Sequence, residues 1–275
     1  MQPGYAVNCG GKRLSAPSTT DCPLFTVVTV VFNGEKELES TILSVLNQSY
    51  RNVEHIIVDG RSTDGTLGIL RKYEASIDYW VSEQDQGIYD AMNKGIRLAR
   101  GEWLYFLNCG DRLVDGEVLE KVAQQLPQTS VPLVIGRVNY LCDGRVVKQF
   151  PADVPAENTA RALFASKFCH QAFFARRQSY IDAGGFDSRF PFFSDFHTAY
   201  RILRDGGGFQ RIDLTIADFD GAGVSSDPRK ALRFYCEAEE VLATLGESKN
   251  VFGFWLGYMR AWVYKLRKSL VANLK

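Results

Sequence analysis

The sequence predicts an α/β protein built on a doubly wound, mostly parallel sheet of the Rossmann type. Short apolar segments rich in β-branched residues alternate with segments whose apolar residues recur at helical spacing, over residues 24–107. That alternation is typical of strands joined by helices that cross a parallel sheet. Polar residues follow the ends of the apolar segments, at the edge where open α/β sheets bind ligands.

The first half of the chain supplies the parallel strands. Residues 24–32 are apolar or β-branched almost throughout, which is typical of a strand covered on both faces. A helix is expected to end near Asn47, because four apolar residues before it share one helical face. The other expected elements are a strand at 53–58, a helix containing Leu67, Leu70 and Tyr73, a strand at 77–81, a helix at 88–99 and a strand at 103–107.

After Asp111 the pattern changes. Two candidate strands, 133–140 and 146–150, flank the turn residues 142–145 and predict a hairpin. The other expected elements are a helix at 118–126, a strand at 171–175, a helix at 195–203, short strands at 209–212 and 216–219, and a helix at 228–245. This order indicates a mixed-sheet extension followed by C-terminal helices.

We therefore expect three parts. Residues 1–22 mix Gly, Ser, Thr and Pro without periodicity and indicate a flexible N-terminal tail. Residues 23–226 form the main domain, divided into halves at 23–114 and 115–226. Residues 227–275 form a C-terminal helical segment.

Composition excludes some classes of protein. Lys+Arg and Asp+Glu both number 32, and a zero net charge argues against a general nucleic-acid binder. The six cysteines are scattered without a paired spacing, which favours free thiols in a reducing compartment. No apolar run follows Lys12 and Arg13, so we do not expect the N-terminus to be a secretory signal, and no apolar stretch reaches the ~20 residues that span a bilayer. We expect a cytoplasmic protein.

The end of the chain, residues 252–275, combines aromatic and basic residues and contains no acidic residue. A helix there would place Phe252, Trp255, Met259 and Trp262 on one side. This pattern suits peripheral binding to an anionic membrane at the inner face of the cell membrane. Packing against the domain or a partner subunit would explain the same pattern.

The strand ends carry carboxylates instead of phosphate-binding glycines. Neither G-x-G-x-x-G nor G-x-x-x-x-G-K-[ST] occurs, so dinucleotide and P-loop motifs are absent from the sequence. Carboxylates can hydrogen-bond a base or ribose, or bind a hard cation that in turn binds phosphates. Those in this region are Asp59, Asp64, Asp85, Asp90 and Asp111.

At this point the sequence resembles the family-2 glycosyltransferases, which have the GT-A fold. The resemblance is dense over residues 24–114 and sparser later. The segments that carry it are Val28 to Asn33, Ser44 to Tyr50, Ile57 to Thr66, Gly87 to Gly95, Ala99 to Trp103 and Leu107 to Asp111.

By that resemblance, the first half would bind a nucleotide sugar. Asp59 would contact the base, Thr29 would line the base pocket, and Asp85 and Asn93 are further candidate substrate residues.

A second segment, at Asn108, corresponds to the metal-binding Asp-x-Asp of the family. Asn108 and Gly110 stand where the carboxylates would be, and Asp111 follows. Asn108 is therefore a candidate substrate residue. Asp111 is the candidate ligand for Mg²⁺ or Mn²⁺, although a turn or cap carboxylate is the alternative.

The segment Phe192 to His197 looks like the one that bears the family's catalytic carboxylate. Aromatic neighbours can desolvate Asp195 and make it more basic, as a general base for the acceptor hydroxyl requires. A carboxylate that only stabilises a helix N-terminus is the alternative. His170 either faces the substrates or metal, or is a hydrogen-bonded strand histidine.

The resemblance implies an inverting glycosyltransferase that moves a sugar from a nucleotide-diphosphate donor to a hydroxyl of a saccharide or lipid-linked saccharide. Assembly of bacterial surface polysaccharides is the expected pathway. Two alternatives stay open: a non-catalytic nucleotide-sugar-binding or scaffold protein of the same fold, and a sugar nucleotidyltransferase. The latter normally has a Gly-rich, basic loop after its first strand, unlike the sequence Asn33 to Glu35.

Overall fold

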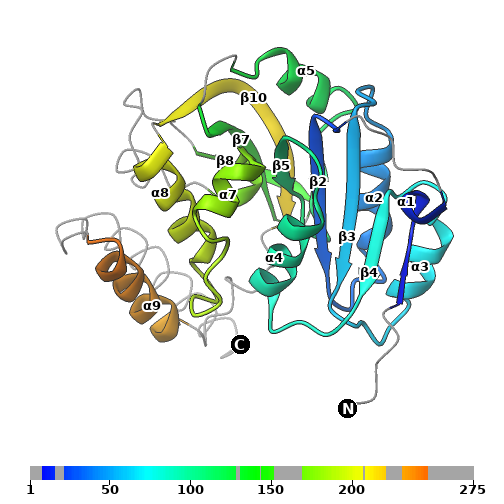
Figure 1. The fold of residues 1–275 in the computed structure, drawn as a ribbon, viewed down its shortest axis with the longest axis horizontal. Coiled ribbons are helices and arrows are strands. Elements are labelled where there is room, and N and C mark those ends of the chain that lie inside the picture. The colour runs from blue at the N-terminus through cyan, green and yellow to red at the C-terminus, as the bar shows by residue number, and fades with distance from the viewer. Residues whose placement is uncertain are drawn as a thin grey trace, which may run out of the picture. The chain divides into compact units, whose positions relative to one another are not determined.

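The structure is a computed structural model of the chain, and it describes residues 8–15, 22–127, 131–142, 144–151, 169–206, 208–220 and 231–246. The chain divides into two compact units, Met1–Asp220 and Gly221–Lys275. The first unit contains the sheet, and it ends with the last strand of that sheet, whereas the expected boundary lies after residue 226 (Figure 1).

Four parallel strands form the first half of the sheet. They are β2 (Phe25–Val31), β3 (Val53–Asp59), β4 (Tyr79–Ser82) and β5 (Trp103–Phe106), in the order β4-β3-β2-β5. Every residue of the central strand β2 is buried, which explains why its sequence is apolar without alternation. The prediction of a doubly wound, mostly parallel sheet is confirmed.

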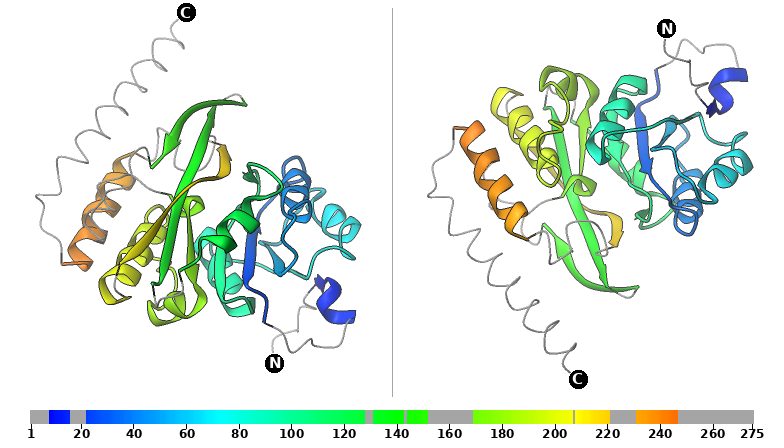
Figure 2. Two further views of the ribbon diagram at one scale, coloured as in Figure 1. Left: turned by 90° about the horizontal axis from the view of Figure 1, so that it is seen from above. Right: turned by 90° about the horizontal axis from the view of Figure 1, so that it is seen from below.

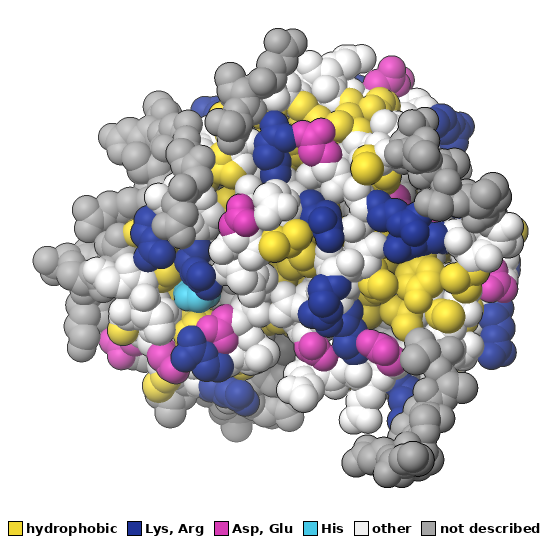
Figure 3. Space-filling view, viewed as in Figure 1, with side chains coloured by type: hydrophobic (Ala, Val, Ile, Leu, Met, Phe, Trp, Pro, Cys, Tyr) yellow, Lys and Arg dark blue, Asp and Glu magenta, His cyan; other side chains and the backbone are white. Residues whose placement is uncertain are grey.

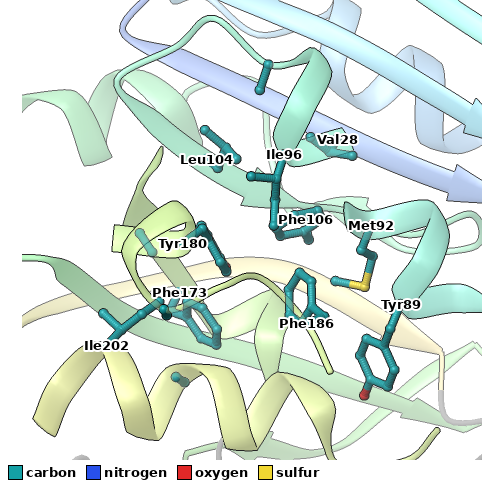
Figure 4. Close-up of a cluster of buried hydrophobic side chains, with 14 of the residues drawn as sticks. Val28, Tyr89, Met92, Ile96, Leu104, Phe106, Phe173, Tyr180, Phe186 and Ile202 are labelled. Atoms are coloured by element: carbon teal, nitrogen blue, oxygen red, sulfur yellow. The ribbon is translucent and has the colours of Figure 1, made fainter. Parts of the chain in front are cut away.

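Helices cover both faces of these strands, as Figures 1 and 2 show. The helices are α2 (Leu38–Leu46), α3 (Thr66–Lys72) and α4 (Ile88–Leu98). On one face, Val28 packs with Met92 and Ile96 of α4 in a large apolar cluster (Figure 4). On the other face, Val31 and Ile57 pack against α2. Successive strand residues point to opposite faces, so one apolar strand serves both layers.

The second half of the sheet is mixed, as predicted. Strand β9 (Phe173–Arg176) runs antiparallel to both β5 and β7 (Leu133–Cys142). Strand β10 (Phe209–Asp220) runs parallel to β7. Strand β8 (Arg145–Phe150) forms the expected hairpin with β7. The remaining elements are β6 (Arg112–Leu113), α5 (Val118–Gln124), the 3₁₀ turn η1 (His170–Ala172), α7 (Arg177–Asp182) and α8 (Ser194–Gly206).

One strand replaces two that the sequence predicts. The expected short strands 209–212 and 216–219 are both parts of β10. The pairing of β10 with β7 shifts register twice, between Arg211 and Thr215 and between Thr215 and Ala217, so β10 carries extra residues there, as in a β-bulge. The polar residues between the two apolar segments therefore mark a bulge within the strand.

Part of the expected N-terminal tail is ordered. Strand β1 (Asn8–Gly10) pairs antiparallel with β4, and α1 (Lys12–Ser15) follows it. The pairing covers the hydrogen-bonding groups at the edge of β4 that would otherwise face water. Gly11 has φ +110°, and a Cβ there would lie 2.6 Å from Asp78 O, so this close approach requires glycine.

The second unit contributes one described helix, α9 (Ala231–Thr244), within the range expected to be helical. The aromatic and basic segment 252–275, for which we expect membrane binding, lies outside the described residues. Among the helices that the structure describes, none has the length and apolarity to cross a bilayer. The six cysteines are free thiols, as predicted.

Candidate functional site

The parallel strands β2, β3, β4 and β5 all end at one edge of the sheet, the lower edge in Figure 1. The candidate residues lie at or just after these strand ends, or in the first turns of neighbouring helices. They form two groups, which we call the donor rim (Phe32, Asp59, Ser62, Ser82 and Asp85) and the base cluster (Tyr89, Asn108, His170 and Asp195).

Asp59 is the buried centre of the donor rim. Its carboxylate accepts hydrogen bonds from the backbone N–H of Ser62 at 3.1 Å and from the hydroxyl of Ser82 at 2.6 Å. Ser82 is the register partner of Asp59 on β4, so the strand pairing itself places the hydroxyl. With no exposed surface, Asp59 shapes the rim from beneath instead of presenting its oxygens to solvent.

Thr29, expected to line a base pocket, lies inside the sheet. It is fully buried in the middle of β2, and its Oγ1 lies 3.1 Å from His55 Nε2 on β3. Burial lowers the pKa of His55 from 6.5 to about 3, so this imidazole is neutral near neutral pH. The pair therefore belongs to the scaffold under the donor rim.

The exposed part of the donor rim joins an aromatic ring to a carboxylate. Phe32, directly after β2, has 65% of its surface exposed. A Cβ on Gly60 would lie 2.4 Å from Asp85 Oδ2 and 3.4 Å from the Phe32 ring, so glycine permits both side chains to approach the loop. Partial burial raises the pKa of the Asp85 carboxyl. The sequence signal for Phe32 was an aromatic residue at the end of a buried strand, before Asn-Gly.

Asn93, expected among the substrate residues, binds backbone instead. Its Nδ2 donates to Phe186 O at 2.7 Å, and Phe186 N donates to its Oδ1 at 2.8 Å. Both functional ends of the amide are thereby used to attach the loop after α7 to helix α4. The structure gives Asn93 a positioning role for that loop.

The base cluster is a chain of hydrogen-bonded side chains. Asn108 Nδ2 lies 2.9 Å from His170 Nε2, and His170 Nδ1 lies 3.2 Å from Asp195 Oδ2. The Tyr89 hydroxyl donates to Asp195 Oδ1 at 3.1 Å. The side chains of His170 and Asp195 are only 11% and 17% exposed, so these bonds lie in a largely desolvated setting.

Sheet topology explains why these four residues meet. Because β9 runs antiparallel to β5, the turn η1 that precedes β9 lies beside the end of β5, and His170 meets Asn108 there. Asp195 and Tyr89 are each the second residue of a helix, α8 and α4. The Tyr89 ring stacks on Phe186 with centroids 5.5 Å apart, and its hydroxyl points away from the apolar cluster (Figure 4).

Asp111, the expected metal ligand, lies next to the base cluster and is 4% exposed. Its Oδ2 accepts a hydrogen bond from Gln171 Nε2 at 2.9 Å, and its backbone carbonyl accepts one from Thr41. Within the described parts of the chain, no three His, Cys, Asp or Glu side chains gather as metal ligands would. Gln171 had only its position beside His170 as a signal.

The structure thus brings Asn108, His170 and Asp195 together, with Asp111 joined to them through Gln171. It buries Thr29 within the sheet and engages the Asn93 amide with the backbone of Phe186. On the face that bears α4 and α7, acidic side chains lie next to basic ones, in keeping with the balanced composition (Figure 3).

Comparison with known proteins decides the family. The sequence model described as Glycosyl transferase family 2 matches residues 26–185, more than half of the chain. The chain belongs to glycosyltransferase family 2. An uncharacterised glycosyltransferase of Mycobacterium tuberculosis is 33% identical over 212 residues, which cover 75% of this chain and 79% of the relative. The resemblance stated from the sequence motifs is confirmed.

A more distant relative of this family-2 glycosyltransferase has a named reaction. The GalNAc(5)-diNAcBac-PP-undecaprenol beta-1,3-glucosyltransferase of Campylobacter jejuni is 25% identical over 244 residues, 86% of this chain and 72% of the relative.

Solved structures show the same GT-A fold. Staphylococcus aureus TarS 1–349 in complex with UDP-GlcNAc gives a TM-score of 0.66 at 19% identity, and the match covers 80% of this chain but 65% of that one. The mannosyltransferase PcManGT of Pyrobaculum calidifontis, in complex with GDP-Man and Mn²⁺, gives 0.61 at 18% identity, covering 84% and 66%.

Proposed function

We propose that this family-2 glycosyltransferase transfers a sugar from a nucleoside-diphosphate sugar to a hydroxyl group of a saccharide or lipid-linked saccharide, with inversion and with Asp195 as general base. The observation that carries the proposal is the base cluster at the carboxyl edge of the sheet. There, one poorly exposed carboxylate is fixed through both of its oxygens.

The donor rim supports a nucleotide donor. Phe32 offers an exposed ring for stacking by a base, and Asp85 offers a carboxylate for a base or ribose beside it. Asp59 would bind the base only through a rearrangement of its bonds to Ser62 and Ser82, so we assign it to shaping the pocket. The TarS and PcManGT structures, which contain UDP-GlcNAc and GDP-Man, support this class of donor.

A lipid-linked acceptor is supported by the Campylobacter relative, whose name specifies an undecaprenol-diphosphate-linked saccharide. We infer from this name a role in building a bacterial surface polysaccharide. Binding to the inner face of the cell membrane through residues 252–275 belongs to the same proposal.

A divalent cation, Mg²⁺ or Mn²⁺, would be bound by Asp111. The donor atoms fit a hard cation, because the Asp111 carboxylate lies beside Gln171, whose Oε1 is buried and has no hydrogen-bond partner in the described chain. When bound, such an ion neutralises charge on the diphosphate. The Mn²⁺ in the PcManGT complex supports the proposal.

The reaction follows from the position of Asp195. Its carboxylate takes the proton of the acceptor hydroxyl while that oxygen attacks the anomeric carbon on the face opposite the nucleotide. The new C–O bond forms as the bond from the anomeric carbon to the diphosphate oxygen breaks, and the nucleoside diphosphate leaves. General-base catalysis of this kind contributes about 10²- to 10⁴-fold in rate.

Thermal shift and transfer assays test this function. We expect one donor from a panel of UDP-, GDP- and dTDP-sugars to raise the melting temperature, and Mn²⁺ or Mg²⁺ to increase the shift, because a ligand that binds only the folded state stabilises it. The same donor should then support sugar transfer to a lipid-linked saccharide. Stabilisation without any turnover would identify a nucleotide-sugar-binding protein instead, and no stabilisation by any donor would contradict the proposal.

A further inference from the structure

His170 has both ring nitrogens engaged by other side chains. Nε2 lies 2.9 Å from Asn108 Nδ2, and Nδ1 lies 3.2 Å from Asp195 Oδ2. The side chain is 11% exposed. An imidazole surrounded in this way presents neither nitrogen to a substrate or a metal ion. Of the two roles considered from the sequence, this geometry fits a hydrogen-bonded histidine and not direct contact with the substrates or metal.

The chemistry of the two partners assigns the ring proton. An amide nitrogen is a donor only, so Asn108 Nδ2 requires a lone pair on His170 Nε2. A neutral imidazole with a lone pair on Nε2 carries its proton on Nδ1. That N–H points at Asp195 Oδ2, and an ionised carboxylate only accepts. In this series of hydrogen bonds each donor therefore faces an acceptor: Asn108 donates to His170, and His170 donates to Asp195.

We propose that Asn108 and His170 are positioning residues for Asp195: Asn108 fixes the Nδ1–H tautomer of His170, and His170 then holds one oxygen of the carboxylate for the incoming acceptor. This inference rests on the proposed function of Asp195. It replaces the direct substrate roles expected for Asn108 and His170 with an action through the carboxylate.

The other oxygen of Asp195 is fixed independently. Oδ1 accepts hydrogen bonds from the Tyr89 hydroxyl at 3.1 Å and from the backbone N–H of Phe196 at 2.8 Å. Two donors on Oδ1 and one on Oδ2 prevent the carboxylate from rotating, and they come from three different elements. The remaining lone pair of Oδ2 then has a fixed orientation. Proton transfer from the attacking acceptor hydroxyl requires such an orientation.

The amide at position 108 matters for this arrangement. An aspartate there would accept a hydrogen bond and would favour a proton on His170 Nε2. Either the Nδ1 lone pair would then face the Asp195 carboxylate, or the ring would become an imidazolium between two carboxylates. In the first state Asp195 Oδ2 has no donor, and in the second its neutral donor is replaced by a charged one. This explains an asparagine where the resemblance to the family leads one to expect a carboxylate.

Nitrogen NMR on the full-length wild-type protein tests the tautomer without any assay of activity. The chain has three histidines, so long-range ¹H–¹⁵N spectra contain three ring systems. The signals of His170 are assigned by their loss in His170→Asn. We expect a protonated Nδ1 and an unprotonated Nε2 at a pH where histidine is neutral. A protonated Nε2, or averaging between the tautomers, would overturn the proposal.

A matched pair of variants tests the positioning role. His170→Asn places an amide N–H where Nδ1 lies, whereas His170→Leu has similar bulk and no donor. We expect kcat to fall about a hundredfold in His170→Leu and by less than about tenfold in His170→Asn, since misplacement of a catalytic group by an ångström can cost about 10²-fold. KM for the donor and donor-induced thermal stabilisation should not change in either variant. Equal kcat in both variants would contradict the proposal.

Asn108→Asp separates positioning from metal binding. If Asn108 acts through His170, the substitution lowers kcat about a hundredfold and moves the ring proton in the NMR spectrum, while donor-induced stabilisation persists. An Asn108→Asp protein with wild-type or higher activity would overturn the inference. Failure of the wild type to transfer from every donor contradicts the proposed function, whereas an active wild type with an unaffected His170→Leu contradicts only the positioning role.

Discussion

The donor rim and the base cluster occupy the same edge of one sheet but use polar side chains differently. In the donor rim, Asp59 is fully buried and bonds to Ser62, in the loop after β3, and to Ser82, at the end of the adjacent parallel strand β4. In the base cluster, Asp195 keeps part of its carboxylate exposed and bonds to Tyr89, 106 positions earlier in the sequence. The first arrangement shapes a surface, and the second fixes a reactive group.

This difference predicts two kinds of mutant. Substitutions beneath the donor rim should lower stability or donor affinity, because the polar groups there bond to each other. Substitutions in the base cluster should lower kcat and leave donor binding intact, because binding and proton transfer use different residues.

The largest effect is expected for Asp195→Asn. The amide preserves shape but cannot take a proton, so kcat should fall by about 10²- to 10⁴-fold. Donor-induced thermal stabilisation should match that of the wild type. Steady-state kinetics with saturating donor measures the first quantity, and the thermal shift measures the second. An Asp195→Asn protein with most of its turnover would remove Asp195 from the chemistry and with it the contrast between the two regions.

Asp59→Ala is expected to have the opposite profile. The hydroxyls of half-buried Ser62 and buried Ser82 lose their acceptor, which should lower the free energy of unfolding by about 2–3 kcal/mol. Ser82→Ala is the matched control and should cost only about 1 kcal/mol, since one neutral donor is removed and Ser62 still bonds to Asp59. Urea denaturation of both variants gives the values. Wild-type stability in Asp59→Ala would show that the carboxylate is not a structural anchor.

The donor rim and the base cluster also differ in how far the sequence predicts them. The parallel strands and the position of Asp59 at a strand end depend on local periodicity, which a single sequence displays. Thr29 was misplaced because a hydroxyl within an apolar strand has the same sequence signal whether it lines a pocket or, as here, bonds to His55 inside the sheet.

The base cluster could be predicted only in part. Asn108, His170 and Asp195 stood out as residue types within motifs, but their hydrogen-bonded order depends on β9 running antiparallel beside β5. Tyr89 and Gln171 carried no local signal that separates them from apolar-face or strand residues. Asn93 stood in a motif, yet its partner Phe186 is 93 positions away. Contacts at such separations are decided by topology.

Buried His55 makes the stability of the fold depend on pH. The folded-state pKa of His55 is about 3, below its ordinary value of 6.5, because burial disfavours the charged form. Between these values the unfolded chain binds a proton that the folded chain does not, so stability falls as pH decreases from 6.5 toward 3. The contribution is about 1.4 kcal/mol per pH unit.

His55→Leu should therefore flatten the dependence of unfolding free energy on pH over that window. The substitution also leaves the Thr29 hydroxyl without its imidazole partner, which lowers stability by a similar amount at every pH and does not affect the slope. Urea denaturation at several pH values separates the two effects. A slope equal to that of the wild type would mean that His55 is protonated in the folded protein and that the scaffold beneath the donor rim is more polar than its burial indicates.

The smallest effect tests the exposed part of the donor rim. Phe32 is 65% exposed, so Phe32→Ala removes few internal contacts and should change the free energy of unfolding by less than about 0.5 kcal/mol. If a base stacks on this ring, donor affinity falls by roughly tenfold, near the lower end of the ~1–3 kcal/mol that such stacking contributes. Isothermal titration with the donor that stabilises the wild type measures this change.

Val147→Ala is the control for Phe32→Ala, because Val147 is a similarly exposed apolar residue, at 56%, on strand β8. It should leave donor affinity unchanged, and Phe32→Tyr should restore most of the affinity that alanine removes. Equal donor affinity in the wild type and Phe32→Ala would place the base elsewhere on the edge. Asp85 would then be the remaining partly exposed carboxylate of the donor rim to test, since the rim's other carboxylate, Asp59, is already bonded to Ser62 and Ser82.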